Sequence, residues 1–461
     1  MDSSQFIDLG YLISASLFVL GIKGLTKPRT AVRGNQLAAT GLILAVLLTL
    51  LHKDIISYKL IIWGGIIGGT IGVNLARRVE MTAMPQLVAA LNGFGGGSSV
   101  AIAAAEYFSG LGAAHTGVTL SAMGITTMVG AVTLTGSFVA FAKLQELIDG
   151  QPMGFPGMKI ANVALVSLAV LLIILLVNNP EATSLYWLLL ITTAALGVLL
   201  VLPIGGADMP VVIALLNSYS GVAAAAAGFL MDNNALIITG ALVGASGLIL
   251  TQIMCRAMNR SLMNVLFGVM AEGGESINAD EVYAGKVKSS SADEVAMILE
   301  TAQRVVIVPG FGLAMAQAQH AVRDLADTLE ANGVEVEYAI HPVAGRMPGH
   351  MNVLLAEAEV PYDKLKDMDA INPTFEQTDV AIVIGANDVT NPMAREDASS
   401  PIYGMPILNV DKARTVVVVK RSLSPGFAGL PNPLFAMDNT LMLFGDGKQA
   451  IIDVNAALKE G

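Results

Sequence analysis

Hydrophobic positions divide the chain into two dissimilar parts. Up to about Cys255, apolar runs recur at the length of roughly 17–25 residues that a helix needs to cross a bilayer. An odd number of such runs places the two termini on opposite sides of the membrane. We predict nine membrane-spanning helices, over residues 6–24, 35–52, 58–76, 83–107, 121–142, 160–178, 185–203, 209–230 and 235–255.

From about Ala271 onward, charged residues are frequent and the apolar runs shorten to strand length. An amphipathic helix is predicted over Leu313–Asn332, with Gly333 as its stop. Strands that alternate with helices indicate a parallel, doubly wound sheet. The predicted strands are Arg304–Pro309, Val334–Ile340, Val380–Ala386 and Thr415–Lys420, with Leu441–Phe444 as a candidate fifth.

The predicted fold is therefore a multi-span α-helical membrane bundle followed by a soluble α/β Rossmann-like domain. We place the membrane domain at residues 1–260, a linker at 261–290 and the Rossmann-like domain at 291–461. Gly and Ser residues in the second half of the linker favour flexibility over packing. A fragment that begins at about Lys286 is expected to fold by itself.

Composition agrees with a membrane protein and narrows the functional classes. Hydrophobic residues make up 54% of the chain and charged residues only 14%, whereas soluble domains carry roughly 25% charged residues. These values exclude a disordered chain and argue against an ordinary soluble enzyme. The net charge of −11, without a basic tract, argues against a nucleic-acid partner. The single cysteine, Cys255, cannot form an intrachain disulfide.

The distribution of Lys and Arg predicts the orientation of the helices. Lys and Arg gather in alternate loops between the predicted helices, and the loops on the other side of the membrane offer only Lys53 and Lys59. The positive-inside rule then places the N-terminus outside and the C-terminal domain in the cytoplasm. The first segment begins with acidic rather than basic residues, so we expect a retained helix and not a cleaved signal peptide. The basic loop residues are Lys23, Lys27, Arg29, Arg33, Arg77, Arg78, Lys143, Lys159, Arg256 and Arg260.

A glycine pair follows the first predicted strand, in the sequence Pro309-Gly310-Phe311-Gly312. Gly-x-Gly at a strand-to-helix turn lets the backbone approach a pyrophosphate, for which the helix N-terminus supplies N–H donors. The third position of the dinucleotide fingerprint is Met315 instead of Gly or Ala. This motif alone does not distinguish a plain tight turn from a nucleotide-binding turn. We find no second nucleotide turn of this type in the polar half.

Another strand closes with Gly385-Ala386-Asn387-Asp388 at the same predicted edge. Ligands of doubly wound sheets lie beyond the carboxyl ends of the strands. Asn387 and Asp388 suit hydrogen bonds to ribose or carboxamide groups there. The alternative is an Asx-type cap for the following segment.

The strand at Thr415–Lys420 leads into Lys420-Arg421-Ser422. Two cations and a hydroxyl suit a phosphate monoester, although a solvated basic pair is the simpler interpretation of the triplet alone. Together with the Gly-x-Gly turn, the triplet favours the 2′-phosphate of a dinucleotide. The second strand supports this weakly, because His341 and Pro342 follow it in place of the acid that would bond a free ribose 2′-hydroxyl.

The segment from His341 to His350 is rich in Gly and Pro and contains Ala344, Gly345 and Arg346. We interpret it as a structured loop over a cofactor. A zinc site is a poor alternative, since no Cys is near and the spacing of the two His is not a ligand pattern.

Polar residues also interrupt the membrane part. Asp208 precedes a predicted span that contains Asn217, while Asn92 and Ser137 lie within two others. The functional interpretation is a proton or ion path. Interhelical hydrogen bonding explains them equally, and Asp208 is also placed to cap its helix.

Five segments of the chain resemble the β subunit of proton-translocating NAD(P)+ transhydrogenase. The resemblance extends over essentially the whole chain, and it implies nine helices followed by a cytoplasmic Rossmann-like domain that binds NADP(H) in reversed orientation. A separate α-type polypeptide would bring NAD(H). The segments are GGADMPVVIALLNSYSG at 205–221, GFGLAMAQAQ at 310–319, HPVAGRMPGHMNVLLAEA at 341–358, VIGANDVTNP at 383–392 and VVKRS at 418–422.

The resemblance implies roles for individual residues of the polar half. Gly310 and Gly312 would line the cofactor, Asp388 would lie near its nicotinamide end, and Lys420 with Arg421 would bind the 2′-phosphate. In the loop that begins at Gly426, Phe427 stands where the family often has Tyr, so a phenol contact to the cofactor is absent.

In the membrane part, Asn217 and Asp208 match family positions linked to proton transfer or coupling. Many family members carry a protonatable His in the fourth helix, where this chain has Asn92. The proton-carrying group is therefore not identified by the resemblance, and His52 is a substitute candidate.

The expected activity is hydride transfer from NADH to NADP+, coupled to proton movement into the cytoplasm across a bacterial inner or internal membrane. No catalytic side chain and no metal are expected, because the hydride passes directly between two nicotinamides. The expected assembly is a dimer of αβ units. The rival hypothesis is a secondary transporter with a regulatory nucleotide-sensing domain, which predicts broken helices at the bilayer midplane.

Overall fold

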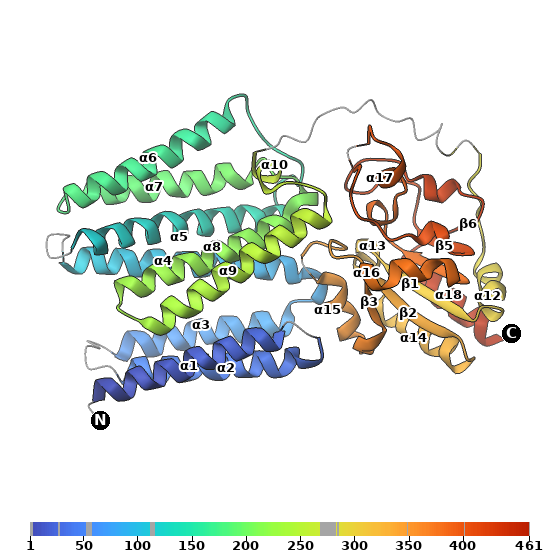
Figure 1. Ribbon diagram of the computed structural model, residues 1–461, viewed down its shortest axis with the longest axis horizontal. Helices are drawn as coiled ribbons and strands as arrows, with labels where there is room; N and C mark the ends of the chain where they lie inside the picture. The colour runs from blue at the N-terminus through green and yellow to red at the C-terminus, as the bar shows by residue number, and fades with distance from the viewer. Residues whose placement is uncertain are drawn as a thin grey trace. The chain divides into compact units, whose positions relative to one another are not determined.

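The computed structural model describes residues 3–25, 28–51, 58–110, 116–267, 283, 285–347, 349–400 and 402–460. Figure 1 shows its helices and strands. The chain divides into two compact units: Met1–Pro203 with Val212–Ile249, and Ile204–Val211 with Leu250–Gly461.

Within the described residues, nine helices are long and apolar enough to cross a membrane, which confirms the predicted spans. Six of these helices begin earlier than predicted, and the second and the fifth differ most from the prediction. Pro28 opens the second helix, where its fixed φ suits the first helical position, and the Thr116 hydroxyl caps the fifth by accepting from Thr119 N. The helices are α1 (Ser3–Leu25), α2 (Pro28–Leu50), α3 (Tyr58–Arg78), α4 (Met84–Gly110), α5 (Gly117–Leu144), α6 (Met158–Asn178), α7 (Thr183–Val201), α8 (Met209–Leu230) and α9 (Asn234–Ala257).

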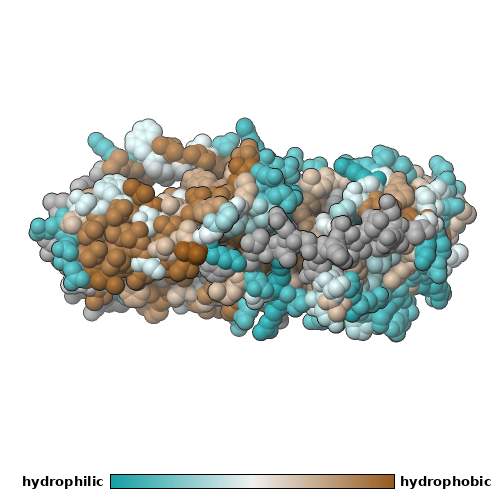
Figure 2. Space-filling model, turned by 90° about the horizontal axis from the view of Figure 1, so that it is seen from above, coloured by the Kyte–Doolittle hydropathy of each residue, from teal (hydrophilic) through white to brown (hydrophobic). Residues whose placement is uncertain are grey.

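Small residues let the membrane helices approach closely. A Cβ added at Gly96 of α4 would lie 2.6 Å from the carbonyl oxygen of Gly130 in α5. A Cβ added at Gly221 of α8 would lie 2.4 Å from the amide nitrogen of Gly244 in α9. Large apolar side chains face outward, and Figure 2 colours much of this helical surface as hydrophobic. Backbone contact inside and apolar side chains outside are typical of helices packed in lipid.

The second unit contains a six-stranded sheet in the order β3-β2-β1-β4-β5-β6, with every pairing parallel. This is the strand order of dinucleotide-binding Rossmann folds, and it confirms the predicted fold class. The short edge strand β3 was not predicted, since only three half-buried or exposed residues form it. The strands are β1 (Arg304–Pro309), β2 (Glu335–Ile340), β3 (Leu365–Asp367), β4 (Val380–Ile384), β5 (Thr415–Lys420) and β6 (Thr440–Phe444).

The central strands are apolar on both faces because the sheet is covered on both sides. Every residue of β4 is buried. On one face, α14 (Gln319–Ala331) contacts β2 and α18 (Gly447–Glu460) contacts β5, with α12 (Ala292–Glu300) against α18. On the other face, a core that includes Phe375, Leu408 and Phe435 packs on alternate strand residues.

The amphipathic helix predicted over Leu313–Asn332 is wrong as a single element. The structure has a five-residue helix α13 (Phe311–Met315) and then α14, separated by Gln317 with a φ of 47°. The turn between them lets α14 bury Val322, Leu325 and Leu329. Apolar positions continue through the break, so the hydrophobic period could not reveal it. Gly333 follows α14 with a φ of 85°, as a helix stop requires.

The end of the predicted linker packs onto the sheet domain. The Tyr283 ring is buried and stacks on Phe435, and its hydroxyl accepts a hydrogen bond from Asn432 N at 3.1 Å. Farther on, Met442 N donates to Lys288 O at 2.7 Å, which joins the segment to β6. A short helix, α10 (Leu262–Phe267), lies at the start of the linker, and residues 268–282 and 284 lie outside the described residues.

We predict that a fragment from Glu281 to Gly461 folds alone and is more stable than one from Lys286. The shorter fragment lacks the buried Tyr283 ring, whose loss should lower the free energy of unfolding by about 3 kcal/mol or more. Urea unfolding of the two fragments measures the difference. Tyr283→Phe in the longer fragment is the control, since it removes only the hydroxyl acceptor and should cost about 1 kcal/mol. Equal unfolding midpoints for the two fragments would contradict the assigned packing.

Candidate functional site

The carboxyl ends of the central strands lie level with one another. Pro309 is opposite Ile384, and Ile384 is opposite Val419, so the loops that follow β1, β4 and β5 meet at one edge. The strand order reverses direction between β1 and β4, which opens a crevice at this edge. A cavity of about 550 Å³ lies there.

The turns after β1 and β4 are packed backbone against backbone. A Cβ at Gly310 would lie 2.4 Å from the Cα of Ala386, and a Cβ at Gly312 would lie 2.6 Å from the Cα of Gly385. Gly385 itself has a φ of 61°. Gly310 N donates to Ile384 O, and Gly312 N donates to Gly385 O, each at 2.9 Å. The glycine pair is therefore needed to join the two turns, whatever ligand the crevice holds.

Asp388 anchors the loop that follows β5. Its Oδ2 accepts a hydrogen bond from Ala428 N at 3.1 Å, and a Cβ at Gly426 would lie 2.7 Å from either carboxylate oxygen. Oδ1 is buried and has no hydrogen-bond partner among the described residues. Burial raises the pKa of Asp388, and the Ala428 amide, the charge of Lys420 and the Phe427 amide oppose that shift. The carboxylate thus has one oxygen committed to the loop and one still able to accept.

Lys420 points into the same loop. Its Nζ donates to Ser424 O at 2.8 Å and lies 4.9 Å from the centre of the Phe435 ring. With its amide oriented to satisfy its neighbours, Asn387 accepts from Lys420 Nζ at 3.0 Å and from Gly426 N at 2.7 Å. Burial lowers the pKa of Lys420 to about 8, although Asp388 opposes that shift. Lys420 is therefore a half-buried organiser of the loop as well as a cation.

Arg421, the next residue, is exposed. Its Nη2 donates to Oδ2 of Asp446 at 2.8 Å, and the Arg421 side chain is 73% exposed. The hydrogen bond from Arg421 is the main cause of a lowered pKa at Asp446. Two adjacent cations of one motif thus face different environments, because Lys420 ends β5 and turns into the following loop, whereas Arg421 lies beyond the strand beside the turn after β6.

The two histidines of the 341–350 loop are buried and hold its shape. His341 Nε2 lies 2.9 Å from Pro406 O, and His341 Nδ1 accepts from Val343 N. His350 Nδ1 accepts from Arg346 N at 3.0 Å, and Gly345, with a φ of 109°, leaves room for its ring. Burial lowers the pKa of both rings to about 4, so both are neutral at pH 7.

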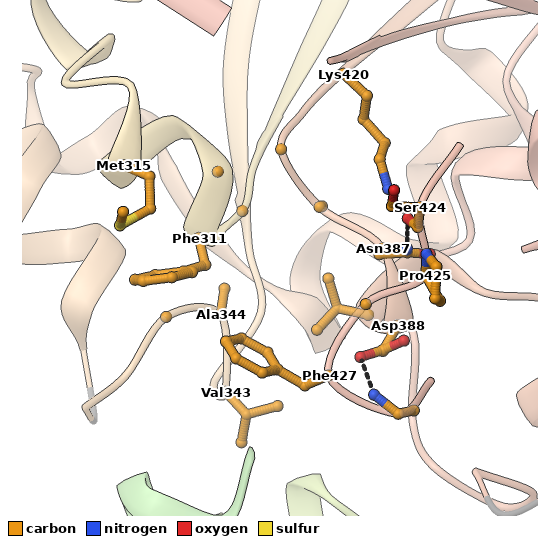
Figure 3. Close-up of a pocket in the computed structure, with 18 of the residues that line it drawn as sticks. Phe311, Met315, Val343, Ala344, Asn387, Asp388, Lys420, Ser424, Pro425 and Phe427 are labelled. Atoms are coloured by element: carbon orange, nitrogen blue, oxygen red, sulfur yellow. Dashed lines mark hydrogen bonds between the residues drawn. The ribbon is translucent and has the colours of Figure 1, made fainter. Parts of the chain in front are cut away.

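Aromatic side chains form one wall of the cavity. The rings of Phe311 and Phe427 lie 5.7 Å apart, and the Arg346 guanidinium lies 4.5 Å from the centre of the Phe311 ring. In Figure 3, Phe311 and Met315 lie on one side of the cavity, and Lys420 and Asn387 on the other. The cavity therefore has an apolar side and a polar side.

The structure brings the predicted cofactor-binding residues together. Arg346 is the exception, because it rests on Phe311 and does not line the cavity. The lining residues among those predicted are Gly310, Phe311, Gly312, Ala344, Gly345, Gly385, Ala386, Asn387, Asp388, Lys420, Arg421, Ser422, Gly426 and Phe427.

Sequence reasoning missed a second Gly-x-Gly turn. Gly445 and Gly447 flank Asp446 between β6 and α18, and both glycines line the same cavity. The absence of a second such turn was therefore a wrong prediction, although this turn does not create a separate site. The signal was present in the sequence as a glycine pair after the candidate fifth strand.

The predicted polar positions of the membrane helices are placed as follows. Asn92 in α4 is buried, and its Nδ2 donates to Ile213 O of α8 at 3.2 Å. Asn217 is half-buried in α8, four residues after Ile213. Ser137 in α5 is buried, and its hydroxyl has no hydrogen-bond partner among the described residues. His52 lies outside the described residues.

Asp208 precedes α8 and forms an ion pair within the second unit. Arg260 Nη1 donates to Oδ1 of Asp208 at 2.7 Å, and the Asp208 side chain is largely buried. The pair links the residues just before α8 to those just after α9. Removing Arg260 would leave the largely buried Asp208 carboxylate without its counterion.

A helical membrane unit joined to a Rossmann sheet, with glycine turns and two cations at the crevice, defines a membrane protein that carries a dinucleotide-type domain. Residues 7–457 match the family described as NAD(P) transhydrogenase beta subunit, and the chain belongs to that family.

Relatives of known description agree. The chain is 51% identical over 447 residues to NAD(P) transhydrogenase subunit beta of Rhodospirillum rubrum, which covers 95% of this chain and 96% of the relative. A sequence of the same description from a second R. rubrum source has the same identity and coverage. The resemblance stated from the sequence is confirmed. A beta subunit implies an alpha subunit as partner.

We predict that Gly310→Ala destabilises the sheet domain. The new methyl group would meet backbone atoms of Gly385 and Ala386, which cannot rotate away, so we expect a loss of about 1–3 kcal/mol. Gly445→Ala is the control, because its Cβ would meet only the Ala450 Cβ at 3.8 Å, with an expected cost below about 0.5 kcal/mol. Urea unfolding of the Glu281–Gly461 fragment measures both. A loss from Gly310→Ala that is as small as the loss from Gly445→Ala would show that the two turns can separate without cost.

Proposed function

We propose that this chain binds NADP(H) in the crevice between β1 and β4 and receives hydride there from NADH held by an α-type subunit. The observation that carries the proposal is the cavity at the strand-order reversal, lined by the glycine turns and the Lys420-Arg421-Ser422 triplet, in a chain of the transhydrogenase beta family. Hydride transfer is coupled to proton movement from outside to the cytoplasm.

The residues at the cavity suit a dinucleotide with a 2′-phosphate. Arg421 is exposed at the rim with guanidinium donors beyond the one given to Asp446, and Ser422 adds a hydroxyl. The buried, unpartnered Oδ1 of Asp388 is an acceptor suited to an amide or ribose donor. No acidic residue directly follows β2, where a Rossmann domain for NAD(H) carries one.

NADP(H) supplies the nicotinamide ring that accepts or gives the hydride. The chain needs no side-chain acid or base for that step. Its tasks are to hold the ring at a fixed distance from the second ring and to exclude water. Phe311 and Phe427 provide apolar surface for this purpose, and Asp388 fixes the loop that carries Phe427.

Proton movement is assigned to the membrane helices. Asn92, Asn217 and Ser137 are polar groups within apolar spans, where an idle polar residue is disfavoured. Asn92 and Asn217 do not titrate, so they would orient water or a proton donor. Asp208 with Arg260 would transmit the state of the membrane helices to the nucleotide domain. One charge that crosses the membrane contributes about 2.3 kcal/mol per 100 mV, which is roughly fiftyfold in the NADPH ratio.

The orientation and location follow from the sequence. The Lys and Arg distribution places the N-terminus outside and the nucleotide domain in the cytoplasm. The membrane is a bacterial inner or internal membrane, and the assembly is a dimer of αβ units. The transporter hypothesis predicts broken helices, whereas α4 runs unbroken from Met84 to Gly110 through the glycine-rich segment Gly93–Gly97.

We expect the purified chain to bind NADP+ at least about tenfold more tightly than NAD+. Arg421→Ala removes a charge-assisted phosphate contact of about 1.5–3 kcal/mol and should cancel most of that preference without changing NAD+ affinity. Arg414→Ala is the matched control, since Arg414 precedes the same strand at the opposite edge of the sheet and pairs with Asp379. Titration calorimetry gives the affinities. Equal binding of the two nucleotides by the unmutated chain would overturn the assignment.

Asn217→Leu should reduce proton-linked transhydrogenation at least about tenfold, which is about 1.4 kcal/mol in barrier, because it removes the hydrogen-bonding groups of the amide but keeps the approximate volume of the side chain. NADP+ affinity should not change. The assay is proton uptake by vesicles with NADH and an NADP+ analogue after an α-type subunit is added, and the chain alone should show no turnover. Ser246→Ala, at an exposed position of α9, is the control. Full pumping by Asn217→Leu would mean that this residue serves only helix packing.

A further inference from the structure

The turn between β6 and α18 places a carboxylate at the rim of the proposed NADP(H) site. Asp446 stands between Gly445 and Gly447, and both glycines line the cavity. Gly445 N donates to Lys420 O at 3.0 Å, so this turn is joined to the end of β5. Asp446 is therefore held beside the basic triplet by the sheet itself.

The two oxygens of the Asp446 carboxylate have separate partners. Oδ1 accepts from Lys448 N at 3.1 Å and from Gln449 N at 3.4 Å, which caps the N-terminus of α18. Oδ2 accepts from Arg421 Nη2 at 2.8 Å. Because the cap fixes the carboxylate, its negative charge stays in place even if the long Arg421 side chain turns away.

Of the two cations in the basic triplet, Arg421 is the one that a phosphate at the rim can reach more easily. Lys420 Nζ is directed to Ser424 O inside the loop, whereas the Arg421 side chain is 73% exposed. A phosphate bound by Arg421 would share the guanidinium with Asp446. Two anions on one guanidinium lie within about 7 Å of each other, which is inside the Debye length of about 8 Å at physiological ionic strength.

We propose that Asp446 is a fixed competitor for Arg421 that limits the affinity of the site for the 2′-phosphate of NADP(H). This inference rests on the proposed function. Asp446 is a positioning residue, since it acts through Arg421 and not by contact with the nucleotide. Its effect is selective, because a nucleotide without the 2′-phosphate brings no second anion to the Arg421 guanidinium. A coupled enzyme benefits from such a limit, because it must release NADPH in every cycle.

The test is nucleotide binding by the full chain in detergent, with Asp446→Asn as the main variant. Asn is as good an N-cap as Asp, so α18 is retained while the charge is removed. The dissociation constant for NADP+ should fall about three- to tenfold, and that for NAD+ should not change. Asp446→Ser, another uncharged cap, should behave in the same way. Asp453→Asn is the control for net charge on the same helix and should leave both constants within about twofold.

The dependence on Arg421 separates competition from other causes. In the Arg421→Ala background, most of the gain from Asp446→Asn should disappear. If Asp446→Asn raised NADP+ affinity just as much in that background, competition for Arg421 would be overturned and only repulsion through space between Asp446 and the phosphate would remain. Unchanged or weaker NADP+ binding by Asp446→Asn would also overturn the proposal. Failure of the unmutated chain to prefer NADP+ over NAD+ would instead reject the proposed function, so the two failures are distinguishable.

Discussion

The contact between the turns after β1 and β4 is the constraint on which the rest of the site depends. Gly310 and Gly312 lie against the backbone of Gly385 and Ala386 at distances that leave no room for a Cβ. This contact closes the base of the crevice and fixes the position of Asn387, which directly follows Ala386. Glycine in a Gly-x-Gly turn is usually explained by the approach of a ligand, whereas here the protein backbone itself requires it.

Above that base, burial separates groups that are neighbours in the sequence. Lys420 turns into the loop, contacts Ser424 and has a lowered pKa, while Arg421 turns outward to Asp446. Asp388 and Lys420 each oppose the pKa shift that burial causes in the other. The loop that carries Phe427 is therefore held by the partly desolvated charges of Asp388 and Lys420. The rim of the cavity is held by the exposed ion pair of Arg421 and Asp446.

The membrane unit uses a different principle. Its helices touch through glycine, and some buried polar side chains, such as Asn92 and Ser218, donate to carbonyl oxygens of neighbouring helices. Asparagine at this position supplies hydrogen bonds but no titratable proton. The proton movement that we propose must therefore use water or another residue, and this position contributes hydrogen-bond geometry and not acidity.

Apolar runs of characteristic length and glycines that follow strands are local signals, and such signals predicted the nine spans, the parallel sheet and fourteen of the residues that line the cavity. The sequence by itself did not reveal the break at Gln317, the edge strand β3 or the packing of Tyr283. These depend on what each segment meets across the fold. The opposite surroundings of Lys420 and Arg421 depend on the folded chain, since Asn387 and Phe435 beside Lys420, and Asp446 beside Arg421, are distant in the sequence.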